Sequence, residues 1–165
     1  MTIKVGDKIP SMKLMVATAD GPKETSTDEI FKGKKVVLFA VPGAFTPTCS
    51  AKHLPGFVQN ADAFKAKGVD TVASITVNDA FVMGAWGRDQ HTAGKVRMMA
   101  DGSAAYSTAL GLTLDLTARG MGVRMNRISM LVDDGVVKQL NVEGPGKFEV
   151  SDADTMLAQA KQVLA

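Results

Sequence analysis

The chain has 165 residues, of which 45% are hydrophobic and 22% are charged, and its formal net charge at pH 7 is +2. These values are ordinary for a globular protein, and the length suits one domain with a sizeable core, so we expect a single domain over residues 1–165. Lysine and arginine form no long block, and the charge therefore gives no reason to expect a nucleic-acid partner.

The N-terminal residues, MTIKVGDKIP, contain no apolar signal-peptide core, and no run approaches the about 18 apolar residues of a membrane span. We therefore expect a cytoplasmic protein with no membrane partner. Cys49 is the only cysteine, and the two histidines are His53 and His91. A lone cysteine excludes an internal disulfide, a C-x-x-C redox pair and a cysteine-rich zinc site, and two separated histidines do not suggest a metal. No metal and no cofactor are expected.

The N-terminal third predicts one central strand. Loosely alternating apolar residues over 3–17 predict an extended segment, a turn follows at 20–22, and residues 26–29 can begin a short helix. The continuous apolar run over 35–41 is typical of a strand that is buried on both faces. It leads directly into Pro42, so the next segment should lie at the carboxyl end of a central strand, where open α/β sheets place their ligand sites.

Cys49 is expected in the first turn of a helix. Thr46 is a typical N-cap, a proline follows at the first helical position, and the apolar spacing continues the helix over residues 47–67. Pro55 should bend this helix one to two turns after the cysteine. Unpaired N–H groups and the positive end of the dipole at a helix N-terminus favour a thiolate, which is the nucleophilic form of the side chain.

The remainder of the chain alternates strands with helices. The clearest signal is a β-hairpin that joins 127–132 to 136–142 through Asp-Asp-Gly. Segment 111–122 is mixed, with a possible helical turn near Leu114, and is a candidate wall of the active site. The remaining predicted elements are strands at 69–77 and 95–99 and helices after Asn78-Asp79, after Asp101-Gly102-Ser103 and after Ser151-Asp152. This order predicts an α/β protein with a mixed β-sheet covered by helices on both faces.

Pro42, Thr46 and Cys49 form the pattern P-x-x-x-T-x-x-C within the stretch PGAFTPTCS…HLPGF. This stretch resembles the active-site segment of the peroxiredoxins, specifically the atypical type II group of small thiol peroxidases. Three further stretches are similar to that family in the same order, namely VNDAFVMGAWGR (77–88), KVRMMADG (95–102) and RISMLVDDGVVK with LNVE (127–143). The resemblance covers nearly the whole chain and implies a thioredoxin-like fold.

The resemblance implies that Cys49 reduces hydrogen peroxide and alkyl hydroperoxides, with an antioxidant role. Thr46 precedes the cysteine by three residues, so helical spacing brings its hydroxyl to the same side. There it could contact both the thiolate and the peroxide. Pro42 would wall the pocket and exclude water, while Thr48, through its N–H group, and Gly43 are expected to bind substrate.

A cation beside the sulfur would stabilise the thiolate and donate forked hydrogen bonds to the peroxide. Spacing alone does not choose among the candidates, which are Arg88, Arg97, Arg119, Arg124 and Arg127. The family's catalytic arginine opens the strand that here reads RISMLV, so the resemblance selects Arg127, with Arg124 as the nearest competitor.

The sulfenic acid that forms at Cys49 must react with another thiol. Some relatives carry a resolving cysteine at the position of Ser74 and others near the C-terminus, but this chain has none at either place. The resolving thiol must therefore come from outside. The resemblance implies glutathione with glutaredoxin, or thioredoxin acting directly.

The resemblance also implies a homodimer formed through the loops around the active site, with Phe45, Phe81 and Trp86 as apolar contributors. Two other functions remain open. One is a peroxide-sensing redox switch or holdase with the same fold, and the other is cysteine-dependent acyl transfer, which needs a positioned histidine. His53 lies on the helix of the nucleophile itself, so we expect it to be structural or to line the pocket.

Overall fold

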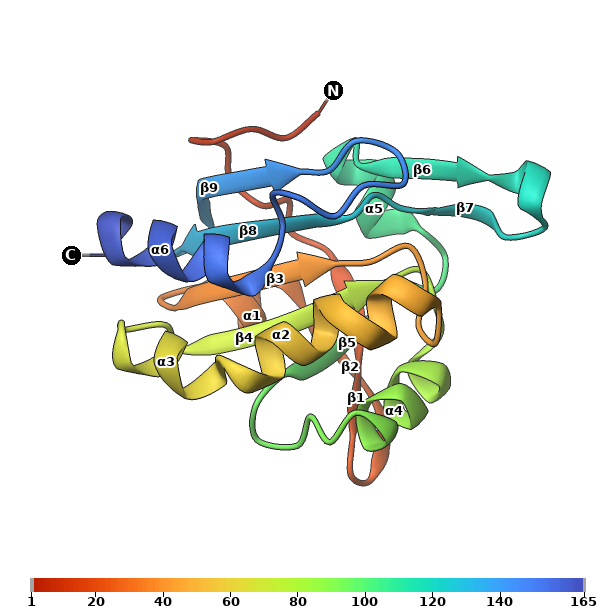
Figure 1. Cartoon of the computed structure of the whole chain (residues 1–165), viewed down its shortest axis with the longest axis horizontal. Coiled ribbons are helices and arrows are strands. Elements are labelled where there is room, and N and C mark those ends of the chain that lie inside the picture. The colour runs from red at the N-terminus through yellow and green to blue at the C-terminus, as the bar shows by residue number, and fades with distance from the viewer. Residues whose placement is uncertain (1, 165) are drawn as a thin grey trace.

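A computed structural model describes residues 2–164 (Figure 1). Its main element is a seven-stranded sheet. In spatial order the strands are β2 (Gly21–Ser26), β1 (Lys13–Thr18), β5 (Arg97–Ala100), β4 (Thr71–Thr76), β3 (Lys35–Ala40), β8 (Ile128–Asp133) and β9 (Val136–Val142). Strand β3 pairs in parallel with β4 and antiparallel with β8, so the sheet is mixed, as predicted.

The central strand β3 divides the hydrophobic core into two clusters, because successive side chains of a strand point to opposite faces. Val36 and Leu38 pack on one face, and Val37 and Phe39 on the other. The helices α1 (Thr27–Phe31) and α5 (Ala105–Leu110) contribute to the first cluster. The second face carries α2 (Leu54–Gln59), α3 (Ala61–Ala66), α4 (Ala80–Asp89) and α6 (Ala153–Val163). Helices therefore cover both faces, as the sequence predicts, and α2, α3 and α6 cross the near face in Figure 1.

The helix that carries the cysteine begins at residue 47, as predicted, but it is not one α-helix. Residues Cys49–His53 form a single π-helical turn, η1, in which the N–H of Leu54 bonds to the carbonyl of Cys49. The ring of Pro55 supplies no N–H to the preceding turn, which accounts for the wider turn directly before it. A second break at Asn60 separates α2 from α3.

The N-terminal prediction is correct in part. The extended segment predicted over 3–17 contains a strand only at β1, and a turn follows it near the predicted place. Strand β2 after the turn was not predicted. Strand β2 lies at the edge of the sheet and has only one buried residue, and its sequence GPKETS lacks the apolar alternation of a half-buried strand. Pro22 is tolerated there because an edge strand leaves some N–H groups unpaired.

Segment 111–122 is mixed, as predicted, and its helical turn lies at 117–119 rather than at Leu114, which is in a strand. Strands β6 (Thr113–Leu116) and β7 (Gly122–Met125) form a separate two-stranded sheet, connected by the short 3-10 turn η2 (Thr117–Arg119). This hairpin projects from the end of the main sheet in Figure 1. It places apolar side chains opposite the start of the cysteine helix.

The β8–β9 hairpin and the capped helices agree with the sequence. The hairpin turns through Asp134 and Gly135, whose φ angles of 49° and 79° match a type I′ turn. Helix α6 is capped by Asp152, which accepts the N–H of Thr155. Within residues 2–164, no helix is long and apolar enough to cross a membrane.

The three aromatic residues proposed for a dimer interface do not share one environment. Phe45 is 52% exposed and Phe81 is 75% exposed. Trp86 is fully buried, and its indole N–H donates to the hydroxyl of Ser50 at 3.0 Å. The prediction that Trp86 contributes to a surface is therefore wrong. Trp86 follows Phe81 by five residues, which places it on the opposite, inward side of α4 and in the core.

Candidate active site

Cys49 lies just beyond the carboxyl end of the central strand, as the sequence predicts. The loop after β3 carries the chain to a helix that begins at residue 47, so Cys49 occupies its first turn. The side chain is fully buried. The first N–H groups of a helix have no partner within the helix, and they concentrate positive potential at this end.

One arginine contacts the thiol directly. The Nη2 of Arg127 donates to the Sγ of Cys49 at 3.1 Å. Arg124, the competing candidate, points elsewhere and donates to the carbonyls of Met121 at 2.8 Å and Val77 at 3.3 Å. A guanidinium at this distance stabilises a thiolate relative to a neutral thiol. The structure thus brings Arg127 to the sulfur and assigns Arg124 to the support of the surrounding loops.

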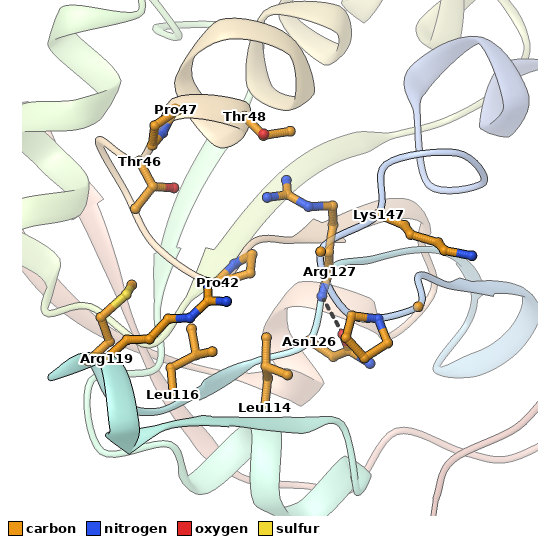
Figure 2. Close-up of a pocket in the computed structure, with 14 residues that line it drawn as sticks. Pro42, Thr46, Pro47, Thr48, Leu114, Leu116, Arg119, Asn126, Arg127 and Lys147 are labelled. Atoms are coloured by element: carbon orange, nitrogen blue, oxygen red, sulfur yellow. Dashed lines mark hydrogen bonds between the residues drawn. The ribbon is translucent and has the colours of Figure 1, made fainter.

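A cavity of about 470 Å³ opens beside this pair (Figure 2). Arg127 lines the cavity and touches the buried sulfur, so the thiol lies immediately beside the open space. Three segments form the walls, namely the start of the cysteine helix, the β6–β7 hairpin and the loop at 144–147. The lining residues are Pro42, Thr46, Pro47, Thr48, Leu114, Leu116, Arg119, Met121, Asn126, Arg127, Gly144, Pro145, Gly146 and Lys147.

The cavity confirms that segment 111–122 forms a wall, because Leu114, Leu116 and Met121 line it. In Figure 2 the two leucines lie opposite the start of the cysteine helix. The wall at 144–147 was not predicted. The only signal for it in the sequence was its position directly after the predicted hairpin strand at 136–142.

Four other predicted site residues meet at the same end of the sheet. Pro42, Thr46 and Thr48 line the cavity. The hydroxyl of Thr46 donates to the carbonyl of Gly43 at 2.7 Å, which leaves its oxygen lone pairs free to accept from a ligand. Gly43 is buried and does not line the cavity. A Cβ there would lie 3.0 Å from Thr46, so the glycine allows that side chain to pack close to the loop.

His53 is fully buried beneath the site, and its two ring nitrogens are occupied. Its Nδ1 lies 3.0 Å from Nη1 of Arg127, and its Nε2 lies 2.9 Å from the carbonyl of Ser151. A guanidinium only donates and a carbonyl only accepts, so the imidazole must be neutral with its proton on Nε2. Burial, followed by the charge of Arg127, lowers the pKa of His53 to about 3, which agrees with a neutral ring.

The expected non-catalytic role of His53 agrees with these contacts, and the acyl-transfer alternative does not. A general base needs a free nitrogen within reach of the thiol proton, whereas both nitrogens of His53 already hold partners. The contact between His53 and Arg127 could not be read from the sequence, because the two residues are 74 positions apart.

Comparison with known proteins points to one family. The family model described as Redoxin matches residues 4–157. Peroxiredoxin-2B of Arabidopsis thaliana is 47% identical over 156 residues, which cover 94% of this chain and 96% of that protein.

Two solved structures are similar over nearly their whole length. Reduced Prx3 from Vibrio vulnificus in complex with hydrogen peroxide is 52% identical, with a TM-score of 0.92 and coverage of 96% of this chain and 99% of that one. Peroxiredoxin 5 from Alvinella pompejana is 34% identical, with a TM-score of 0.86 and coverage of 97% and 99%. The fold is accordingly thioredoxin-like, as the sequence predicts.

Proposed function

This chain belongs to the redoxin family, as a peroxiredoxin of the type II group, and we propose that Cys49 and Arg127 form the centre of its thiol peroxidase reaction. The protein reduces peroxides at the expense of thiols and has an antioxidant function. The observation that supports this assignment best is the 3.1 Å contact between the guanidinium of Arg127 and the sulfur of Cys49.

The proposed first step is attack by the thiolate of Cys49 on one peroxide oxygen. The S–O bond forms while the O–O bond breaks, so the sulfur is oxidised to sulfenic acid. The second oxygen leaves as hydroxide or alkoxide and takes a proton to give water or an alcohol. Negative charge moves from the sulfur to the departing oxygen, and a fixed guanidinium beside both stabilises that charge without reorganisation.

Three neighbours complete the proposed peroxide site. The hydroxyl of Thr46, already oriented by its bond to Gly43, accepts a hydrogen bond from the peroxide. The N–H groups of Thr48 and Cys49, in the first helical turn, donate to the peroxide oxygens. Pro42 carries no N–H and shields the thiolate from water. Together these groups hold the O–O bond in line with the sulfur.

The second half of the cycle requires an external thiol, and we assign this role to glutathione followed by glutaredoxin, with thioredoxin as the alternative. The thiol attacks the sulfenic sulfur, releases water and forms a mixed disulfide, which a second thiol reduces. The residues that line the cavity include three cations, Arg119, Arg127 and Lys147, and no carboxylate. A small thiol that carries carboxylates, such as glutathione, complements this charge.

The test of the reductant measures steady-state hydrogen peroxide consumption with glutathione plus glutaredoxin, and separately with thioredoxin plus its reductase. We expect faster turnover with the glutathione system. Turnover with thioredoxin alone would overturn the assignment of the reductant but not of the peroxidase. If Cys49 is oxidised once and neither system restores it, the redox switch or holdase becomes the better interpretation.

A second experiment tests the charge of the cavity. The rate at which glutathione reduces the sulfenic form is compared between wild type and Arg119→Gln, with Arg97→Gln, an exposed arginine outside the cavity, as the control. We expect Arg119→Gln to slow glutathione but not an uncharged thiol, and Arg97→Gln to slow neither. Equal slowing of both thiols by Arg119→Gln would argue against recognition of charge.

A homodimer in the cytoplasm remains part of the same proposal. Phe45 and Phe81 are large apolar side chains on the surface, and burial between two subunits would remove both from water. A free thiol that depends on thiol reductants suits a reducing compartment. Sedimentation of wild type and Phe81→Asp tests the dimer, since a charge in the interface should give a monomer.

A further inference from the structure

The guanidinium of Arg127 is part of a closed ring of four hydrogen-bonded residues. Its Nη1 donates to Nδ1 of His53, whose Nε2–H donates to the carbonyl of Ser151. The N–H and the hydroxyl of Ser151 both donate to the carboxylate of Glu143, at 2.8 Å and 2.7 Å. The N–H of Glu143 then donates to the backbone carbonyl of Arg127 at 3.0 Å, which closes the ring.

The members of this ring cannot easily move independently. His53, Glu143 and Ser151 are buried, so a hydrogen bond broken within the ring would not be replaced by water. The imidazole also packs against Phe39, Phe57 and Phe148, with ring centroids 5.0 Å, 5.6 Å and 4.9 Å away. The ring of Phe148 in addition faces the guanidinium of Arg127 at 5.8 Å.

Arg127 needs such support because its side chain has many rotatable bonds. Only one branch of the guanidinium, Nη2, contacts the sulfur, and the other branch, Nη1, contacts His53. Fixing Nη1 therefore fixes the direction in which Nη2 points. Without an acceptor for Nη1, the guanidinium would be free to rotate toward the cavity that it lines.

We propose that His53 is a positioning residue that holds the guanidinium of Arg127 against Cys49, with Ser151 and Glu143 anchoring the imidazole in turn. This inference rests on the proposed role of Arg127 in peroxide attack. His53 exchanges no proton with substrate and touches none of the reacting atoms. His53 contributes the acceptor Nδ1, and the hydrogen bond from its Nε2 to Ser151 sets the orientation of the imidazole.

The two ring nitrogens can be tested separately. An asparagine at position 53 can place its amide oxygen near the position of Nδ1 and so retain the acceptor for Arg127. A glutamine can place its amide nitrogen near Nε2 and so retain the donor to Ser151, but it loses the acceptor. We expect peroxide to oxidise Cys49 about 10- to 100-fold more slowly in His53→Gln, and near the wild-type rate in His53→Asn.

The decisive experiment combines His53→Gln with Arg127→Gln in a double-mutant cycle on the rate of Cys49 oxidation by hydrogen peroxide. If His53 acts only through Arg127, the histidine substitution should change the rate by less than about twofold once Arg127 is absent. His91→Gln, the same change at the exposed second histidine, is the control and should keep the wild-type rate.

Each alternative outcome has one meaning. An equal fold-loss from His53→Gln in both backgrounds would overturn the inference and indicate a general structural role. Wild-type rates in His53→Gln would overturn it as well. If Arg127→Gln alone oxidises at the wild-type rate, the proposed role of Arg127 fails first. A variant that does not fold is replaced in the cycle by His53→Asn, for which a loss as large as in Arg127→Gln would contradict the inference.

Discussion

The Nη2 of Arg127 lies 3.1 Å from the Sγ of Cys49, although 78 residues separate the two in the sequence. Cys49 comes from the first turn of the helix that follows the central strand, and Arg127 directly precedes β8, which pairs with that same strand. Antiparallel pairing places the beginning of β8 beside the carboxyl end of β3. The topology of the sheet therefore creates the contact.

Removal of the guanidinium should slow peroxide attack without unfolding the protein. Arg127→Gln is expected to lower the rate of Cys49 oxidation roughly 100- to 1,000-fold, because a preorganised donor beside the developing charge is lost. Stopped-flow mixing with hydrogen peroxide measures this rate. Arg124→Gln is the matched control and should affect stability more than this step, since Arg124 bonds to three backbone carbonyls and not to the sulfur. Equal losses in the two variants would show that the wrong arginine has been assigned.

Glu143 should be important for stability. Its carboxylate accepts the N–H groups of Glu149, Val150 and Ser151 and the hydroxyl of Ser151. Glu143→Gln turns an amide donor toward these donors and should lower the free energy of unfolding by about 1–3 kcal/mol. Urea denaturation measures the change. Glu149→Gln, which alters an exposed side chain, is the control, and an equal loss there would contradict the explanation.

The same carboxylate predicts a loss of stability in acid. Burial, the largest single effect, would raise the pKa of Glu143, but the hydrogen bonds from Glu149, Ser151 and Val150 together lower it. A carboxyl whose pKa is lower in the folded state stabilises the protein above its unfolded pKa, and this contribution disappears as the pH falls through the folded value. The free energy of unfolding of Glu143→Gln should therefore depend less on pH below about 4.5 than that of wild type.

His53 should make the free energy of unfolding depend on pH at higher pH values than Glu143 does. Its pKa falls from 6.5 to about 3 in the folded protein, through burial first and the charge of Arg127 second. Between these values the unfolded chain binds a proton that the folded protein does not, so stability decreases as the pH falls below 6.5. The slope should approach about 1.4 kcal/mol per pH unit. Unfolding measured from pH 6.5 to pH 5 should show this slope in wild type and His91→Gln, whereas an unchanged slope in His53→Asn would contradict it.

Ser74 offers a stabilising substitution. Its hydroxyl is fully buried in β4 and has no hydrogen-bond partner within residues 2–164. Ser74→Ala removes an unsatisfied polar group and should raise the free energy of unfolding by about 1 kcal/mol. Ser129→Ala is the matched control, because the equally buried hydroxyl of Ser129 accepts from Asn141 at 3.0 Å. That variant should lose stability, and a loss of the same size in Ser74→Ala would refute the prediction.

Much of the fold could be predicted because local signals agreed with tertiary structure. Strand β3 was predictable from its continuous apolar run, and the β8–β9 hairpin from the Asp-Gly turn. Strand β2 was not, because this edge strand buries only one residue and carries no apolar alternation. The π-helical turn at Cys49–His53 was not predicted. The proline indicated a bend in the helix, but not that the carbonyl of Cys49 would accept from the N–H of Leu54, five residues on.

The residues of the candidate site differ in how far the sequence could predict them. The helix N-terminus pointed to Cys49 from local chemistry alone, whereas only resemblance to a family separated Arg127 from four other arginines. The ring that supports Arg127 could not be predicted, because His53, Ser151 and Glu143 meet through long-range packing. The same holds for Trp86, whose inward position depends on the orientation of α4 against the sheet.

The sulfur of Cys49 is the atom that gives electrons to the peroxide in the proposed reaction. The most direct test mixes the reduced protein with one equivalent of hydrogen peroxide in the absence of any other thiol, and follows peroxide loss together with sulfenic acid formation. We expect wild type to consume the peroxide and to form sulfenic acid at Cys49, and Cys49→Ser to do neither while remaining folded. Peroxide consumption by Cys49→Ser at the wild-type rate would contradict the account.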